Sequence, residues 1–276
     1  MGWVPDLADH RDCAWNDTNV VVTLQALSRT SGNPQAVDWR DFCGPIENQQ
    51  DLSTSPAHAC IALIQHFERR STGRLVCPSR LFLHRAALRM ERALDGPLSL
   101  RPTLKACAQF GLLDEKHWPY GRVFLTHELD GLTCCMCRQL RGLRYVRLDD
   151  RGSTGPELLE RLRSFLAAGF CFAFGFSVHG SITVDADIWF PSRADSLLGG
   201  QAVIAVGYDN KLRIRSDRGA FLIRNSWGTD WGNKGYGWLP YSYVTDRLAL
   251  DFWTLIKPSW LRSEEFGSPF ESPAVN

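Results

Sequence analysis

Apolar residues in the first half of the chain follow the spacing of helices. Segment 56–70 carries apolar side chains around most of its circumference, which predicts a helix buried on most sides. Pro56 suits the first helical position and Ser55 suits the N-cap, so the helix is expected to begin there. Similar patterns predict three further helices, at 79–94, 100–110 and 158–168.

The second half of the chain changes to a pattern typical of strands. Its strand-like segments are rich in Val, Ile and aromatic residues and are bounded by Gly, Asp and Asn; they lie at 202–208, 219–225, 235–239 and 251–256. Helices followed by antiparallel strands predict an α+β fold. We expect a mainly helical lobe over 37–150, an antiparallel β lobe over 151–256, and a cleft between them.

The two ends of the chain differ from these lobes. Residues 1–36 are polar and rich in turn-forming residues, which predicts an N-terminal arm that leads into the first lobe. Residues 257–276 are rich in Ser and Pro, and we expect them to form a mobile tail.

Composition narrows the classes of partner. The 276 residues are 44% hydrophobic, enough for a substantial core, and the net charge of +1 gives no electrostatic reason to expect a nucleic acid or a membrane partner. The sequence contains no apolar run of about 18 residues, the length that a spanning helix needs. Residues 1–19 lack the charged and then apolar pattern of a signal peptide, so a cytoplasmic protein is expected.

Cysteine usage agrees with a reducing compartment. The chain has nine cysteines, an odd number, and we expect them to be free thiols. Cys134 and Cys137 have the spacing of a zinc ligand pair, but no second pair stands out. We therefore expect buried or loop thiols there, with no metal and no other cofactor.

Several short motifs stand in a distinctive order along the chain. They are Val-Asp-Trp-Arg at 37–40, Ile-Glu-Asn-Gln at 46–49, Trp-Pro-Tyr at 118–120, Gly-Gly-Gln-Ala-Val at 199–203, and Asn-Ser-Trp-Gly at 225–228. Together they resemble the papain-like cysteine peptidases, especially bacterial members without a secretory leader, over residues 1–256. The resemblance implies the papain-like two-lobe fold. The 36 residues before Val37 are fewer than the usual prosegment of that family, so no inhibitory prosegment is expected.

The resemblance also implies a role for each position of the family's catalytic centre. Gln49 falls at the oxyanion glutamine, and Ser55 falls where the family has its nucleophilic cysteine. Gln201 falls at the catalytic histidine, and Asn225 at the asparagine that orients it. Trp227 falls where an indole covers the contact between histidine and asparagine.

These residue types do not support the family's chemistry. A serine hydroxyl is a much weaker nucleophile than a thiolate, and the Gln201 amide can neither take nor return a proton near neutral pH. Losing the base alone is expected to lower the rate on the order of 10³-fold or more. We therefore predict that papain-type proteolysis is absent. Ser55 also has a purely structural interpretation as an N-cap.

Other residues near the predicted cleft leave alternatives open. His58 lies three residues beyond Ser55 on the same helix, and His179 follows the apolar run 170–178. Each is a candidate base for Ser55. The alternative interpretation is that His58 is a packed helix histidine and that His179 is a loop histidine. The family's substrate-binding segment falls on 96–99, where Pro97 lacks an N–H and Leu98 is bulky. Gly200, beside Gln201 in the motif at 199–203, is also expected to lie at the cleft.

Three functions remain open at this point. The first is a papain-fold pseudopeptidase that binds a peptide, a protein or another ligand in the former cleft. The second is a repurposed lyase, cyclase or transferase that uses the polar residues of that cleft. The third is a cysteine peptidase whose nucleophile has been substituted by serine, and Gln201 argues against it because one blocking substitution is enough.

Overall fold

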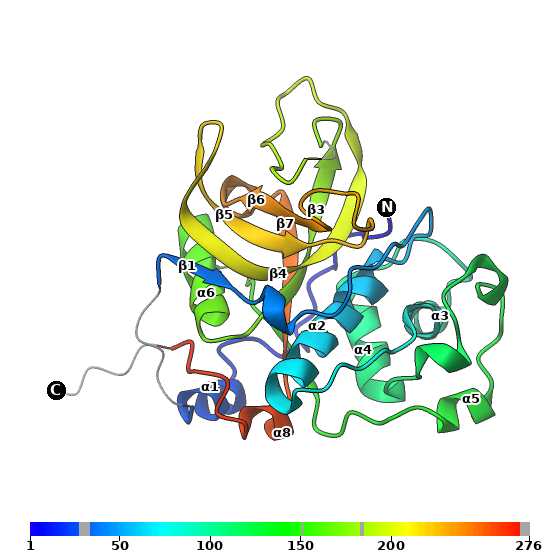
Figure 1. Cartoon of the computed structure of the whole chain (residues 1–276). Coiled ribbons are helices and arrows are strands. Elements are labelled where there is room, and N and C mark those ends of the chain that lie inside the picture. Colours follow the sequence, from blue (N-terminus) through cyan, green and yellow to red (C-terminus); the bar gives the residue numbers. More distant parts are fainter. Residues whose placement is uncertain (28–33, 151, 183–184, 271–276) are drawn as a thin grey trace.

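A mainly helical lobe packs against a twisted antiparallel sheet. The computed structural model describes residues 1–27, 34–150, 152–182 and 185–270 (Figure 1). The helical lobe is built from α2 (Ser55–Thr72), α3 (Arg80–Met90) and α4 (Leu100–Phe110). This arrangement confirms the α+β fold with a helical first lobe and an antiparallel β second lobe.

The sheet draws strands from both halves of the chain. Its strand order is β2-β7-β3-β4-β5-β6, and β1 pairs with β4 outside this path. The strands are β1 (Ala36–Asp38), β2 (Arg144–Arg147), β3 (Phe172–His179), β4 (Leu197–Ile214), β5 (Asp217–Arg224), β6 (Tyr236–Pro240) and β7 (Ala249–Ile256). The predicted boundary at residue 151 therefore needs correction, because β1 and β2 precede it yet belong to the sheet.

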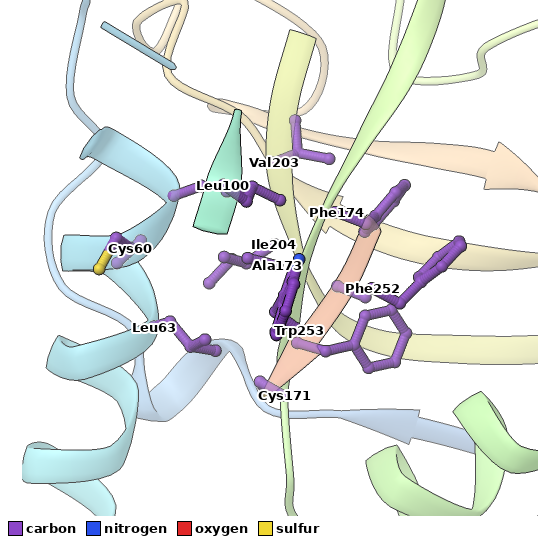
Figure 2. Close-up of a cluster of buried hydrophobic side chains, with 14 of the residues drawn as sticks. Cys60, Leu63, Leu100, Cys171, Ala173, Phe174, Val203, Ile204, Phe252 and Trp253 are labelled. Atoms are coloured by element: carbon purple, nitrogen blue, oxygen red, sulfur yellow. The ribbon is translucent and has the colours of Figure 1, made fainter. Parts of the chain in front are cut away.

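Helix α2 is the centre of the hydrophobic core. Cys60 and Leu63 of α2 are fully buried, and they share one cluster with Ile204 of β4 and Trp253 of β7 (Figure 2). Burying one large apolar side chain contributes about 1.5–3 kcal/mol. The apolar pattern around α2 thus fixes the helix between the other helices and the sheet.

The remaining helices are short or peripheral. They are α1 (Thr18–Gln25), α5 (Gly131–Cys135), α6 (Gly155–Ala167), α7 (Ser242–Thr245), α8 (Pro258–Leu261) and the 3₁₀ turns η1 (Arg40–Phe42), η2 (Glu115–His117) and η3 (Arg122–Phe124). Val20 and Leu24 of α1 are buried, so the N-terminal arm is more regular than its polar composition predicted. Within the described ranges, no helix combines the length and the apolar character that a membrane span needs.

The C-terminal segment is packed where a mobile tail was expected. Trp260 of α8 stacks on Phe67 of α2 with ring centroids 5.0 Å apart, and Phe266 stacks on the same ring at 5.5 Å. Both side chains are buried. Aromatic residues scattered among Ser and Pro thus hold the tail on the core up to residue 270, and residues 271–276 lie outside the described ranges.

An ion-pair cluster fastens the N-terminal arm to β7. Asp251 accepts a hydrogen bond from the backbone N–H of Asp6 at 2.7 Å and another from Arg147 Nη2 at 2.7 Å. Burial is the main cause that raises the pKa of Asp251 to about 7, and the nearby Asp6 carboxylate raises it further. The folded protein therefore retains the proton of Asp251 up to about pH 7, well above the ordinary value of 3.8.

Replacing Asp251 by asparagine should change the pH dependence of stability. Because the folded pKa lies above the ordinary value of 3.8, Asp251 stabilises the fold most at low pH and loses this contribution as pH rises toward 7. The difference in unfolding free energy, wild type minus Asp251→Asn, should fall by up to about 1.4 kcal/mol per pH unit. Urea denaturation at pH 4.5 to 8 measures this difference, and a difference that stays constant contradicts the assignment. Wild type is compared with the variant because other groups also make the unfolding free energy depend on pH. The pKa of buried His58 is lowered to about 4, so its contribution to stability grows as pH rises, opposite to that of Asp251.

Candidate functional site

The four predicted catalytic positions converge at the junction of the two lobes. Gln49 precedes α2, Ser55 is the first residue of α2, Gln201 lies in β4, and Asn225 directly follows β5. Backbone pairing fixes the approach of the first and last segments, because the N–H of Gln49 donates to the carbonyl of Ser226 at 2.8 Å. All four side chains are buried, and those at 49, 55 and 201 are 0% exposed.

A hydrogen-bonded network of amide side chains joins Gln49, Gln201 and Asn225. Gln201 Nε2 donates to Gln49 Oε1 at 2.8 Å and to Asn225 Oδ1 at 2.9 Å. Ser226 Oγ donates to the same Gln49 oxygen at 2.7 Å. Gln49 Nε2 turns away and donates to the carbonyl of Leu52 at 3.1 Å. In this arrangement Gln49 presents an acceptor, not a donor, to the centre, so it is unsuited to stabilise an oxyanion.

Ser55 bridges the lobes instead of capping the helix. Its Oγ accepts a hydrogen bond from the backbone N–H of Ala202 at 3.3 Å. The N-cap is Thr54, which corrects the predicted cap, and Thr54 makes no side-chain capping bond. Thr54 Oγ1 and Tyr120 Oη lie 2.6 Å apart, and Tyr120 donates to the carbonyl of Gln49 at 2.9 Å. Tyr120 thereby ties the loop of Gln49 to the start of the helix.

Neither candidate histidine is hydrogen-bonded to Ser55. His58 Nδ1 lies 3.0 Å from the carbonyl of Thr54, so this nitrogen carries the proton. His179 is at the end of β3 opposite Leu197, whereas Gln201 pairs with Phe176. Three residues of strand separate the two pairings, roughly 10 Å along β3. Among the described residues, Ser55 therefore has no imidazole as a hydrogen-bond partner.

His58 lines a small cavity that has both polar and apolar residues in its wall. Its Nε2 lies 3.9 Å from Glu47 Oε2, and Arg224 and Asn225 line the same cavity. Burial is the main cause that lowers the pKa of His58 to about 4. His58 is therefore neutral at pH 7, and its free Nε2 faces this cavity on the side of α2 that carries Ala59 and Ala62.

The N-terminal arm passes through the groove between the lobes. The N–H of Trp3 donates to the carbonyl of Gly200 at 3.2 Å on the β side. On the helical side, Leu98 N–H donates to the carbonyl of Gly2 at 3.0 Å, and Val4 N–H donates to the carbonyl of Leu98 at 3.2 Å. Trp3 thus forms an isolated parallel β-bridge with Leu98, flanked by the bonds of Gly2 and Val4. In Figure 1 the N-terminus lies near this boundary between sheet and helices.

The indole of Trp3 fills a slot in the sheet wall. A Cβ atom at Gly175 would lie 1.9 Å from the indole, and one at Gly200 would lie 2.5 Å from it. Trp3 is only 5% exposed. Leu98 uses both backbone groups to hold the arm, while the neighbouring Pro97 is exposed. The predicted cleft is therefore filled by the chain's own arm.

Comparison with known proteins identifies the fold family. The model of the papain family cysteine proteases matches residues 33–244. The chain belongs to the papain family. It is 30% identical to an uncharacterized peptidase C1-like protein of Acanthamoeba polyphaga mimivirus, over 80% of this chain and 70% of that protein. It is 25% identical to mexicain of Jacaratia mexicana, over 74% of this chain and 86% of mexicain.

A solved structure of the papain family superposes over nearly the whole chain. Xylellain, a cysteine protease from Xylella fastidiosa, aligns with a TM-score of 0.73 and 28% sequence identity. The alignment covers 93% of this chain and 95% of xylellain. The fold therefore agrees with a papain-family structure in both lobes.

Several residues around this papain-family centre were missed by sequence analysis. Ser226 completes the amide network, and Trp3 fills the groove. A signal for the slot was present, because Gly175 interrupts the apolar strand Phe174–Phe176, and a strand glycine often marks the close approach of another group. Trp227, which the sequence analysis did single out, is half-buried and meets Trp231 edge-on, with centroids 5.4 Å apart.

The cysteine cluster supplies no metal site in the described part of the chain. No group of three or more His, Cys, Asp or Glu side chains is placed there to hold a metal ion. Cys137 is buried in a small cluster with Phe82 and Trp118, and Cys135 is exposed. These cysteines pack as separate thiols.

Proposed function

We propose that this chain is a pseudopeptidase of the papain family, which holds a peptide segment in its former substrate groove without cleaving it. The observation that carries the proposal is the hydrogen bonding of Gln201. Its amide spans Gln49 and Asn225 at the position of the family's catalytic histidine. Among the described residues, no imidazole, amine or carboxylate is hydrogen-bonded to the Ser55 hydroxyl, whose partner is the backbone N–H of Ala202, so we propose that it has no general base.

The groove retains the backbone features of a peptide site. Leu98 and Gly200 offer carbonyl groups on opposite walls, and both are used by the chain's own residues 2–4. Strand addition of this kind derives affinity from the main chain and specificity from side-chain pockets. A non-catalytic binding role is favoured over a repurposed enzyme, because the Gln201 amide is already hydrogen-bonded to Gln49 and Asn225 and can neither take nor give a proton near neutral pH.

A degradation assay tests the loss of proteolysis. Incubation of the purified chain with a diverse peptide mixture at pH 4 to 9, followed by mass spectrometry, should give no products above a no-protein control. A papain-family peptidase with its cysteine and histidine in place is the positive control. Cleavage that disappears in a Ser55→Ala variant would refute the proposal.

A further inference from the structure

The slot that holds Trp3 is shaped by glycines with no conformational need to be glycine. The three atoms nearest to a Cβ at Gly175 all belong to the Trp3 indole, and this glycine does not adopt a positive φ. Gly200 likewise lies outside the positive-φ set, and a Cβ there would meet the indole and carbonyl of Trp3. The missing side chains at both positions therefore leave room for the Trp3 indole, and at Gly200 also for the Trp3 carbonyl group.

The residue before the tryptophan is also restricted. A Cβ on Gly2 would lie 2.3 Å from the backbone carbon of Ser53, just upstream of α2. Backbone cannot move aside as a flexible side chain can, so this position accepts only glycine. Val4, the residue after the tryptophan, is 40% exposed and is not restricted in the same way. The groove thus accommodates a glycine followed by a large flat aromatic residue.

We propose that this groove is a selective binding site for an extended Gly-Trp segment of another protein, and that the N-terminal arm competes for it within the chain. The inference rests on the pseudopeptidase function proposed above. The partner segment would bind as residues 2–4 do, with main-chain hydrogen bonds to Leu98 and Gly200 and its indole against Gly175. The same contacts serve a segment in cis or in trans, because they involve only the segment and the groove walls.

Recognition of the indole rests on its shape. The Nε1 atom of Trp3 is buried without a hydrogen-bond partner among the described residues. The slot therefore makes no use of the indole N–H, and a naphthyl ring of similar size should bind at least as well. A small side chain such as alanine would lose the buried ring and should bind weakly.

An external peptide can bind in the groove only when the N-terminal arm of the chain has left it. A segment attached to the same chain competes at a high effective concentration, so an external peptide gains access only in proportion to the undocked fraction of the arm. Weakening the arm should therefore raise the apparent affinity for an external peptide. This behaviour separates a specific groove from a nonspecific apolar surface.

Fluorescence anisotropy with a labelled acetyl-Gly-Trp-Val-Pro peptide tests the proposal on the full chain. The Trp3→Ala variant should bind the peptide at least about tenfold more tightly than wild type, because the slot is vacated. Adding Gly175→Ala to Trp3→Ala should abolish this gain, since the new Cβ occupies the slot. Gly180→Ala is the matched control, because a Cβ there would make only ordinary contacts with Ser196, at 3.4 Å from its Oγ and 3.9 Å from its carbonyl oxygen.

A second variant keeps the test decisive if Trp3→Ala does not fold. Gly2→Val should expel the start of the arm through its collision with Ser53 and leave the groove walls unchanged. Specific binding by either folded variant, with loss for an alanine-substituted peptide, supports the proposal. No specific binding by a folded variant overturns it. Mass spectrometry of the same samples separates the two proposals, because cleavage of the bound peptide would refute the pseudopeptidase function while binding stands.

Discussion

Replacing Trp3 by alanine is expected to lower the free energy of unfolding by about 3–5 kcal/mol, the range for removing a buried aromatic side chain. The indole is buried in the slot formed by Gly175 and Gly200, and the backbone of residues 2–4 is hydrogen-bonded to both walls of the groove. Losing the ring should release residues 1–4 and loosen the contact between the lobes. Chemical denaturation of the variant measures the stability, and proteolysis near the N-terminus reports the release.

A double-mutant cycle shows whether the slot is the cause. Gly175→Ala alone should destabilise wild type, because its Cβ would lie 1.9 Å from the indole. In the Trp3→Ala background the same substitution should have little effect, so the two changes should couple by about 1–3 kcal/mol. Gly180→Ala should show no coupling with Trp3→Ala. Additive effects of Trp3→Ala and Gly175→Ala would contradict the packing of the indole in this slot.

Introducing a cysteine at position 55 and a histidine at position 201 should not produce peptidase activity while the arm is in place. The double reversion Ser55→Cys with Gln201→His supplies a thiol and an imidazole, but residues 2–4 still fill the groove. Peptide cleavage should therefore remain at background. Adding Trp3→Ala should open the groove and raise the cleavage rate on the order of 10³-fold over wild type, the scale of positioned acid–base catalysis.

The controls for this experiment isolate each step. Ser55→Cys with Trp3→Ala lacks the imidazole, and Gln201→His with Trp3→Ala lacks the thiol, so both should stay near background. Initial rates on a fluorogenic peptide give the comparison. Equal activity of the double reversion with and without Trp3→Ala would show that the arm does not block the groove.

The sequence predicted the fold and the convergence of residues that share a motif. The apolar pattern of 56–70 correctly placed α2 in the core, because a helix with apolar side chains on most faces has only one stable environment. The family motifs also placed Gln49, Gln201 and Asn225 within one site. These features follow from local pattern and from resemblance, so they need no knowledge of side-chain orientation.

Other features depend on packing that no local pattern encodes. The direction of the Gln49 amide is set by Gln201, Ser226 and Leu52 together, and the role of Trp3 depends on glycines more than 170 residues away. The tail is held by contacts of Trp260 and Phe266 with Phe67, although its composition favours disorder. In each case long-range burial overrides the local signal.

The reactivity of the Ser55 hydroxyl tests the central claim most directly. In the Trp3→Ala variant, where the groove is open, a fluorophosphonate probe should leave Ser55 unmodified at pH 7 to 9 as read by peptide mass spectrometry. Stoichiometric labelling of Ser55 in the folded protein, lost when His58 or His179 is replaced by alanine, would show that a base acts on the hydroxyl and would contradict the account.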